Sequence, residues 1–458
     1  MLFSSATFLF AFLPVVALLY YLIPKRCTAA RNLFLTGASL LFYAWGEPRF
    51  VLVMLLVIVS SWLFARKIEA SAKSARKGFL LVAVSVDLTV LFVFKYLGFF
   101  TENLNRLPFV RLPVPQITLP IGISFFTFQA ISYVVDVYRG EAAQKSLWDV
   151  MLYIAFFPQL IAGPIVRYSD FADQIHNRQE SLQNWNRGGY RFAIGLGKKV
   201  ILSNNLAYVA DAAFSSVGNL SFSMAWIGAV GYSLQLYFDF AGYSEMSNGL
   251  SLMMGFECPA NFNLPYISGS ITEFWRRWHI SLSGWFRDYI YIPLGGNRCS
   301  AGRQMLNMLA VWALTGIWHG ANWNFICWGL YYFVLLVIEK NFLMKYLKKG
   351  KVWPHIYTLF LVVLGWGLFT CNAPGAPLGL LLSRLFIPQG GVSALYFLRN
   401  YAVLLVVCCV CSTQLPGRFW QCCKGKAPLR AALCGVCFVL CTAYVVAATG
   451  STALYANF

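Results

Sequence analysis

Long hydrophobic runs separated by short polar connections make up most of this 458-residue sequence. A helix needs about 20 mainly apolar residues to cross the hydrocarbon core of a bilayer, and many of the runs approach this length. They lie near residues 5–23, 32–46, 48–65, 78–100, 117–138, 146–166, 190–214, 222–254, 304–318, 322–339, 353–371, 395–411 and 429–449. The pattern predicts an all-α, polytopic integral membrane protein with about 11–13 membrane-spanning helices, some of them split, plus re-entrant or amphipathic helices.

Composition supports this fold class. Hydrophobic residues make up 59% of the chain, charged residues make up 12%, and the mean hydropathy is +0.62, which excludes an ordinary soluble enzyme. The first run lacks a preceding basic residue and a following small-residue cleavage site, so we expect a retained helix and not a signal peptide. We expect one integral domain over residues 1–458, with a motif-bearing core at about 119–332 and peripheral helices at 1–118 and 353–458.

The net charge of +19 comes from 36 basic and 17 acidic residues. The basic residues lie mainly between hydrophobic runs, where they set membrane orientation, so no nucleic acid partner is expected. Basic clusters at 25–31 and 66–77 flank a connection that offers only Glu47 and Arg49, which predicts cytoplasmic clusters and an outside N-terminus. Further clusters at 345–351 and 418–430 predict two more cytoplasmic loops and an outside C-terminus, in the inner (cytoplasmic) membrane.

Thirteen cysteines raise the question of disulfides or a metal site, and eight of them follow residue 400. Most lie inside apolar runs, where a thiol behaves as a small hydrophobic group. A structural zinc site needs a closed set of four ligands, and no histidine is nearby in the sequence. We therefore expect packing roles for these cysteines and no metal.

Polar residues concentrate in the hydrophobic runs between about 119 and 330. Polar groups within membrane segments are energetically costly, so they point to a functional region. The segments are LPIGISFFTFQAISYVVDVYRG (119–140), FFPQLIAGPIVRYSDF (156–171), YSLQLYFDFAGYSEMSNGL (232–250), TEFWRRWHISLSGWFRDY (272–289) and LTGIWHGANWNFICWGLYY (314–332).

Only four histidines are available as bases near neutral pH. We interpret His176, in a polar connection, and His355, beside the lysine-rich connection, as incidental. His319 lies in an aromatic and apolar run between Gly316 and Gly320, and this glycine spacing allows a helix or a substrate to approach the backbone closely. A histidine simply packed between helices is the alternative to a functional role for His319.

The segment at 272–289 has the periodicity of an amphipathic helix. Ser270 and Glu273 form a capping-box pattern that predicts a helix start, and the helix is expected to continue through the segment. On a helical wheel, one face is aromatic, the other carries Glu273, Arg276, Arg277 and Arg287, and His279 lies at the border. Either the helix anchors the protein at the membrane interface, or its guanidinium groups hold the phosphates of an anion on the cytoplasmic side.

The segments YFDFAGYSEM, NFNLPYISGSITEFWRRWHISLSGWFRDYIYIPLGGNR, TGIWHGANW and FFPQLIAGPIVRY together resemble the membrane-bound O-acyltransferase superfamily. The resemblance is closest to the bacterial branch typified by the alginate O-acetyltransferase membrane subunit. It is dense from about 119 to 332 and looser at both ends. By position, the essential histidine of the family corresponds to His319 and the second motif histidine to His279.

This resemblance implies an O-acyltransferase that moves an acetyl group from a cytoplasmic thioester, expected to be acetyl-coenzyme A, to a hydroxyl outside the membrane. A related D-alanyl transferase of teichoic acid synthesis uses an acyl carrier protein, which leaves the carrier of the donor open. The resemblance also implies an acceptor hydroxyl on an extracytoplasmic polysaccharide or partner protein, and a separate extracytoplasmic partner of the serine-hydrolase type. No bound cofactor is expected.

The chemistry of the residues agrees with such a reaction. An alcohol that attacks a thioester needs a base to take its proton and polar donors to stabilise the oxyanion. We expect His319 to be the general base and His279, Asp239 or Asn322 to support it, with Arg276, Arg277 and Arg287 as candidates for binding the donor phosphates. The alternatives are a transporter or flippase, whose pathway would also be polar at the midplane, and a non-catalytic subunit of a polysaccharide-export complex.

Overall fold

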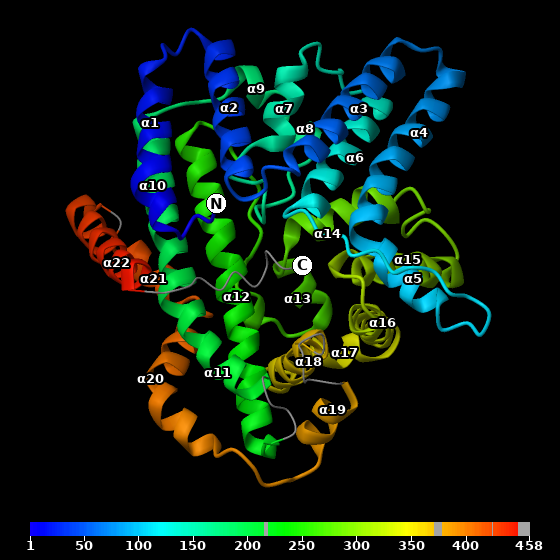
Figure 1. The fold of residues 1–458 in the computed structure, drawn as a ribbon. Coiled ribbons are helices and arrows are strands. Elements are labelled where there is room, and N and C mark those ends of the chain that lie inside the picture. The colour runs from blue at the N-terminus through cyan, green and yellow to red at the C-terminus, as the bar shows by residue number, and fades with distance from the viewer. Residues whose placement is uncertain (215–218, 371–377, 424, 448–458) are drawn as a thin grey trace. The chain divides into compact units, whose positions relative to one another are not determined.

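In the computed structural model, the described residues are 1–214, 219–370, 378–423 and 425–447. Within these residues the secondary structure is helical, apart from an isolated parallel bridge between Leu220 and Val392 (Figure 1). The predicted all-α class is confirmed. The chain divides into two compact units, one of residues 1–192 and 246–259 and the other mainly of residues 193–245 and 260–456. The single-domain expectation stays a prediction.

Six helical stretches in the described part of the chain are long and apolar enough to cross a membrane. They are Val51–Ala70, Lys73–Leu104, Trp323–Leu347, Trp353–Thr370, Ala394–Cys411 and Ala427–Ala447. A shorter apolar stretch covers Phe8–Leu22. The protein is therefore a multi-pass membrane protein. The other predicted spans form helices that are more polar or are interrupted. Hydropathy and helix length therefore do not show how many of these helices cross the membrane.

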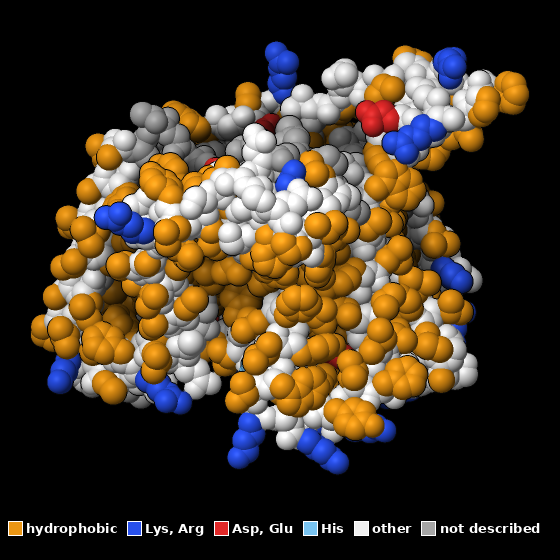
Figure 2. All heavy atoms as spheres, turned by 90° about the horizontal axis from the view of Figure 1, so that it is seen from below, with side chains coloured by type: hydrophobic (Ala, Val, Ile, Leu, Met, Phe, Trp, Pro, Cys, Tyr) orange, Lys and Arg blue, Asp and Glu red, His pale blue; other side chains and the backbone are white. Residues whose placement is uncertain are grey.

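Hydrophobic side chains point outward from several of these helices, as expected where lipid replaces water. Val403 is 79% exposed and Val446 is 70% exposed. Figure 2 shows hydrophobic side chains over much of the face that it draws, with lysine and arginine side chains projecting mainly at its edges.

The first unit contains most of the N-terminal helices. Its helices are α1 (Leu13–Leu22), α2 (Thr28–Gly46), α3 (Val51–Ala70), α4 (Lys73–Leu91), α5 (Leu97–Leu104), α6 (Ile123–Arg139), α7 (Leu147–Ala155), α8 (Tyr168–Phe171), α9 (Gln174–Asn177) and the larger part of α10 (Leu182–Gly197). Two π-helical stretches, η1 (Phe8–Phe12) and η2 (Phe92–Tyr96), interrupt the α-helices. Helices α3, α4 and α6 pack against one another (Figure 1).

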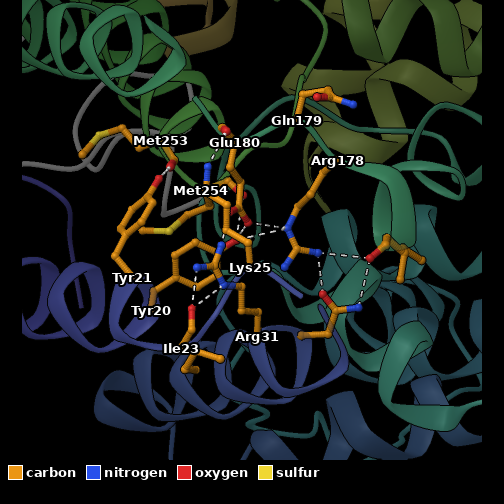
Figure 3. A network of polar contacts seen from close by, with 12 residues as sticks. Tyr20, Tyr21, Ile23, Lys25, Arg31, Arg178, Gln179, Glu180, Met253 and Met254 are labelled. Atoms are coloured by element: carbon orange, nitrogen blue, oxygen red, sulfur yellow. Dashed lines mark hydrogen bonds and ion pairs between the residues drawn. The ribbon is translucent and has the colours of Figure 1, made fainter. Parts of the chain in front are cut away.

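A buried polar network fixes the start of the chain within the first unit (Figure 3). The carboxylate of Glu180 pairs with Arg31 of α2 and with Arg178, and it accepts a hydrogen bond from the hydroxyl of Tyr20 on α1. The Tyr20 hydroxyl also lies 3.1 Å from the carbonyl oxygen of Met254. Because the side chains of Arg31, Arg178 and Glu180 are no more than 9% exposed, removing the Glu180 carboxylate would leave two guanidinium groups buried without a compensating charge.

The predicted span at 146–166 is wrong in its second half. Helix α7 ends at Ala155, and an irregular but buried segment follows. Pro158 and Pro164 cannot donate backbone hydrogen bonds, which disfavours a continued helix. The irregular backbone is hydrogen-bonded inside the unit, since the Phe157 nitrogen donates to the Ser39 hydroxyl at 3.1 Å. It is also closely packed there, because a Cβ added to Gly163 would lie 2.7 Å from the Ser247 hydroxyl.

The second unit contains the remaining helices. They are α11 (Asn204–Phe214), α12 (Phe222–Met253, shared with the first unit at its end), α13 (Ile271–Arg277), α14 (Ile280–Phe286), α15 (Ala301–His319), α16 (Trp323–Ile338), α17 (Met344–Leu347), α18 (Trp353–Thr370), α19 (Leu378–Phe386), α20 (Ala394–Cys411), α21 (Leu415–Cys422) and α22 (Ala427–Ala447). The stretches η3 (Lys198–Ser203), η6 (Arg287–Tyr291) and η7 (Glu339–Leu343) are π-helical, and η5 (Pro265–Ile267) is a 3-10 turn.

Close backbone packing joins α15 to α16. A Cβ added to Gly316 would lie 2.5 Å from the carbonyl oxygen of Phe325, and one added to Gly329 would lie 2.4 Å from that of Trp312. A Cβ at Gly320 would lie 2.2 Å from the Phe325 ring. The prediction that Gly316 and Gly320 permit a close approach is confirmed, and the approaching group is α16.

Candidate functional site

The segment at 272–289 forms two helices and not the single helix expected from its periodicity. Helix α13 ends at Arg277, and α14 begins at Ile280. His279 lies between them with φ of +45°, in the left-handed region that costs a non-glycine residue about 1–2 kcal/mol. The continuous helical wheel is therefore wrong beyond Arg277, and the break places His279 at the N-cap of α14.

The start of α13 is fixed by three side chains. The predicted capping box is present: the Ser270 hydroxyl accepts a hydrogen bond from the Glu273 nitrogen at 3.0 Å, and the Glu273 carboxylate accepts one from the Gly269 nitrogen at 2.9 Å. Burial acts to raise the pKa of Glu273, but the hydrogen bonds from Gly269 and Arg277 lower it overall. In addition, the buried Glu339 carboxylate accepts hydrogen bonds from the backbone of Ile271 at 2.6 Å and of Thr272 at 2.8 Å.

His279 is held by Asn261, a residue in the connection that precedes α13. The Asn261 side-chain oxygen lies 3.0 Å from Nδ1 of His279, and it accepts hydrogen bonds from the nitrogen and hydroxyl of Ser281 at 3.3 and 2.9 Å. Its side-chain nitrogen donates to the Ser244 hydroxyl at 3.0 Å, and its carbonyl oxygen accepts from the Ile280 nitrogen at 3.0 Å. These contacts stabilise the unusual backbone of His279. The edge of the imidazole packs against Phe240, with ring centroids 4.6 Å apart.

His319 is the last residue of α15 and lies among aromatic rings. Its ring centroid lies 4.9 Å from that of Trp328, 5.0 Å from that of Trp318 and 5.2 Å from that of Phe369. The side chain is buried, and Trp318 also contacts the His279 ring, with centroids 6.2 Å apart.

His279 and His319 line the same cavity, which has a volume of about 270 Å³. Aromatic residues, including Trp275 and Trp312, form much of its wall. Arg276 is the third ionisable side chain of the lining. Residues 40 apart in the sequence therefore line one cavity, with two imidazoles in a largely apolar setting.

A second cavity of about 630 Å³ adjoins the first, because Thr272 and Arg276 line both. The second cavity is more polar and is also lined by Glu273, Lys348 and His355. Lys348 comes from the lysine-rich connection between α17 and α18, and His355 lies in the first turn of α18. Arg276 thus lies between the cavity that Lys348 lines and the cavity of the histidine pair.

The three candidate arginines have different surroundings. Arg276 lines both cavities, and within the described residues it makes no ion pair. Arg277 pairs with Glu273 at 2.8 Å, and Arg287 pairs with the neighbouring Asp288 at 2.7 Å. Neither Arg277 nor Arg287 lines the two cavities. Of the predicted donor-binding residues, the structure thus brings only Arg276 to the histidine pair.

The two candidate supporting residues do not line the histidine cavity. Asp239, on α12, forms a buried ion pair with Lys199 of η3. Asn322 is the N-cap of α16, and its side-chain oxygen accepts from the Asn324 nitrogen at 3.4 Å. Asn261 forms a hydrogen bond with His279, and sequence reasoning missed it because it lies in an irregular connection without periodicity.

Glu339, Lys348 and His355 were also missed as site residues. Glu339 is a charged residue at the end of the apolar run at 322–339, and a buried charge needs specific partners, so its position was the available signal. The signal for Lys348 was its lysine cluster, which was interpreted only as a marker of orientation. His355 was interpreted as incidental, and the structure places it in the lining of the larger cavity.

The electrostatic setting of His279 favours a neutral imidazole. Burial, and then the nearby His319, lower the pKa of His279 well below its ordinary value of 6.5. His279 lies outside the six apolar stretches that could cross the membrane. A neutral imidazole in a mainly apolar cavity can accept a proton from a hydroxyl, and aromatic N–H groups and the Arg276 guanidinium can interact with anionic groups.

Comparisons with known proteins agree on one family. The model of the family described as MBOAT, membrane-bound O-acyltransferase family, matches residues 54–373. The chain is 46% identical over 383 residues to a probable alginate O-acetylase AlgI of Pseudomonas aeruginosa, covering 81% of this chain and 72% of that protein. It is 36% identical over 376 residues to a peptidoglycan O-acetyltransferase of Helicobacter pylori, covering 75% and 71%. A teichoic acid D-alanyltransferase of Bacillus subtilis is 29% identical over 357 residues, covering 75% and 88%.

Proposed function

Because the chain belongs to the membrane-bound O-acyltransferase family, we propose that this O-acyltransferase moves an acetyl group from cytoplasmic acetyl-coenzyme A to a hydroxyl outside the membrane. The observation that carries the proposal is the shared cavity of His279 and His319, which adjoins a basic cavity at Arg276. The first supplies bases for acyl transfer, and the second supplies cationic groups for a phosphorylated donor.

His319 acts as the general base in this proposal. It takes the proton of the acceptor hydroxyl as the oxygen attacks the thioester carbonyl, and the carbon–sulfur bond then breaks. General base catalysis by a positioned histidine contributes typically about 10²–10⁴-fold to such a rate. The wall of the cavity is mainly apolar, which disfavours water beside the thioester and so limits its competing hydrolysis.

Arg276 and Lys348 bind the phosphates of the donor in the larger cavity. A guanidinium matches phosphate geometry in a bidentate manner, and a lysine adds a compact charge. The lysine-rich connection beside this cavity supports a cytoplasmic position under the positive-inside rule. We therefore place the donor entrance on the cytoplasmic side of the inner membrane, with both chain termini on the outer side.

The acceptor is a polysaccharide hydroxyl or the serine of an extracytoplasmic partner that relays the acetyl group to it. The relatives named for alginate and for peptidoglycan support O-acetylation of a glycan over transfer of D-alanine, since their identity to this chain is higher. A separate partner of the serine-hydrolase type would bring the acceptor to the outer end of the histidine cavity.

The test uses the full chain in proteoliposomes with acetyl-coenzyme A labelled in the acetyl group, and a glycan with the extracytoplasmic partner on the opposite side. We expect a labelled ester on the acceptor side. Label that crosses without forming an ester would indicate a transporter or flippase, and neither movement nor ester would indicate a non-catalytic subunit. Either result overturns the proposal.

The His319→Ala variant tests whether the general base of the reaction lies in the histidine cavity. It should insert and express normally but lose ester formation. His176→Ala is the matched control, because His176 is largely exposed and pairs with Asp149 in the first unit. Full activity of His319→Ala would show that the base is another group.

A further inference from the structure

The Asn261 side-chain oxygen has an unusually well-defined role. It accepts a hydrogen bond from the backbone N–H of Ser281, a group that can only donate, at 3.3 Å. The Asn261 side-chain nitrogen donates to the Ser244 hydroxyl at 3.0 Å, which agrees with this orientation of the amide. The atom 3.0 Å from Nδ1 of His279 is therefore an acceptor, so Nδ1 must carry a proton.

A neutral imidazole has one protonated nitrogen, so a proton on Nδ1 makes Nε2 the acceptor. We propose that Asn261 is a positioning residue that holds neutral His279 in the Nδ1–H tautomer, so that Nε2 receives the proton of the acceptor hydroxyl through His319 and passes it to the leaving thiolate. This inference rests on the proposed acyl transfer. Beyond that reaction, it makes Nε2 of His279 a second proton acceptor in the histidine cavity. Asn261 is the residue that sets the tautomer of His279.

The proton transfers balance. The hydroxyl oxygen forms a bond to the thioester carbonyl carbon and its proton passes to His319. His319 transfers a proton to Nε2 of His279, the carbon–sulfur bond breaks, and Nε2–H gives the proton to the thiolate. The products are an ester and a thiol, and both imidazoles return to their neutral forms.

The amide of Asn261 suits this relay better than a carboxylate would. Its oxygen accepts the Nδ1–H bond whether His279 is neutral or cationic, so orientation is kept in both states. Because an amide carries no charge, it does not strongly stabilise the imidazolium, which remains acidic enough to protonate a thiolate. A carboxylate at the same place would retain the proton. Asn261 is only 2% exposed, so the difference between an amide and a carboxylate in stabilising the imidazolium is weakly screened and large.

The elements packed against His279 contribute few other charges. The ionisable groups in the lining of its cavity are Arg276 from α13 and His319 from α15, and α12 contributes the ring of Phe240. Both ionisable groups disfavour a proton on His279 when they are charged. A carboxylate introduced at 261 would therefore be the main group acting in the opposite direction.

The first experiment reads the tautomer directly. With ¹⁵N-labelled histidine in the full-length protein, the ring shifts distinguish Nδ1–H from Nε2–H, and the His279 signals among those of four histidines are identified by their loss in a His279→Gln variant. We expect the Nδ1–H form at neutral pH in the wild type and a mixture in Asn261→Ala. An Nε2–H form in the wild type would overturn the inference, whatever the outcome of the acetyl-transfer assay.

The second experiment compares Asn261→Asp with Asn263→Asp. The Asn263 side chain is exposed, so the control adds the same charge two residues away. We expect Asn261→Asp to move the acid limb of the pH–rate profile upward by about one pH unit or more and to lower the rate at pH 7 at least about 10-fold. Asn263→Asp should keep the wild-type profile. An unchanged profile in Asn261→Asp, in protein that is folded by thermal melting, would contradict the role.

Discussion

The carboxylate of Glu339 accepts two hydrogen bonds from Thr272, one from the backbone nitrogen at 2.8 Å and one from the hydroxyl at 2.7 Å. Glu339 lies in η7, after α16, and Thr272 is in the first turn of α13. The first backbone N–H groups of a helix have no acceptor within the helix, and the Glu339 carboxylate supplies one at the N-terminus of α13. Its negative charge also interacts favourably with the helix dipole. A charge at the end of an apolar helix thus helps, together with Ser270 and Glu273, to determine where the helix that presents Arg276 begins.

Glu339→Gln is expected to lower both stability and activity. The amide retains one acceptor oxygen and places an NH₂ group against a backbone donor, so the loss should be about 1.5–3 kcal/mol. The measurements are the thermal midpoint in detergent and the rate of acetyl transfer. Glu102→Gln, at an exposed position of α5, is the control. If the two variants behave alike, the contact with Thr272 does not position α13.

Arg276→Ala is expected to weaken donor binding. Loss of a charge-assisted hydrogen bond to phosphate costs about 1.5–3 kcal/mol, so KM for acetyl-coenzyme A should rise roughly 10- to 100-fold with a smaller change in kcat. Arg303→Ala is the control, since Arg303 is exposed on α15 and lines neither cavity. Equal KM values for the two variants would exclude Arg276 as a donor ligand.

The lowered pKa of His279 predicts a loss of stability in acid. Below pH 6.5 the unfolded chain binds a proton at this residue, whereas the folded protein does not until a much lower pH. The folded state is therefore destabilised as pH falls from about 6.5, and above this pH the residue has no effect on stability. Thermal midpoints of wild type and His279→Gln between pH 7.5 and 5 measure the effect. The wild type should show the steeper decline, and parallel curves would contradict a lowered pKa.

Gly316→Ala is expected to separate α15 from α16 and to displace His319. Its Cβ would lie 2.5 Å from the Phe325 carbonyl oxygen, so one helix must move, at a cost of about 1–3 kcal/mol. Gly302→Ala is the matched control in the same helix, because a Cβ there has open space around it. We expect a lower thermal midpoint and at least a several-fold loss of acetyl transfer for Gly316→Ala alone. Identical melting curves would mean that the packing adapts without a cost.

The sequence predicted features that depend on local pattern. Hydropathy predicted an all-α membrane protein, the Ser270–Glu273 spacing predicted the start of α13, and the Gly316–Gly320 spacing predicted close packing. Each of these features depends either on the geometry of residues close in the sequence or on the burial of an entire hydrophobic segment. The same local pattern failed at His279, because the left-handed residue that ends the helical path is held by Asn261, 18 positions earlier in the chain.

The partners of the site residues could not be predicted from periodicity. Asp239 was a reasonable candidate to orient a histidine, but the buried Lys199 pairs with it instead. The arginines of the segment at 272–289 were equivalent on a helical wheel, whereas in the structure the adjacent Asp288 pairs with Arg287 and only Arg276 lines the cavities. Which partner each of these side chains has depends on which segments lie side by side in the folded protein.

The contacts of the first helix set an order for the biogenesis of this protein. The hydroxyls of Tyr20 and Tyr21 contact the carbonyl oxygens of Met254 and Met253, which follow more than 230 positions later. While the chain emerges from the ribosome, these phenols and the nearby Arg31 therefore still lack their final partners. The N-terminal helices can reach their native arrangement only after the end of α12 has been synthesised and inserted, so translation of the first half of the chain precedes assembly of its first unit.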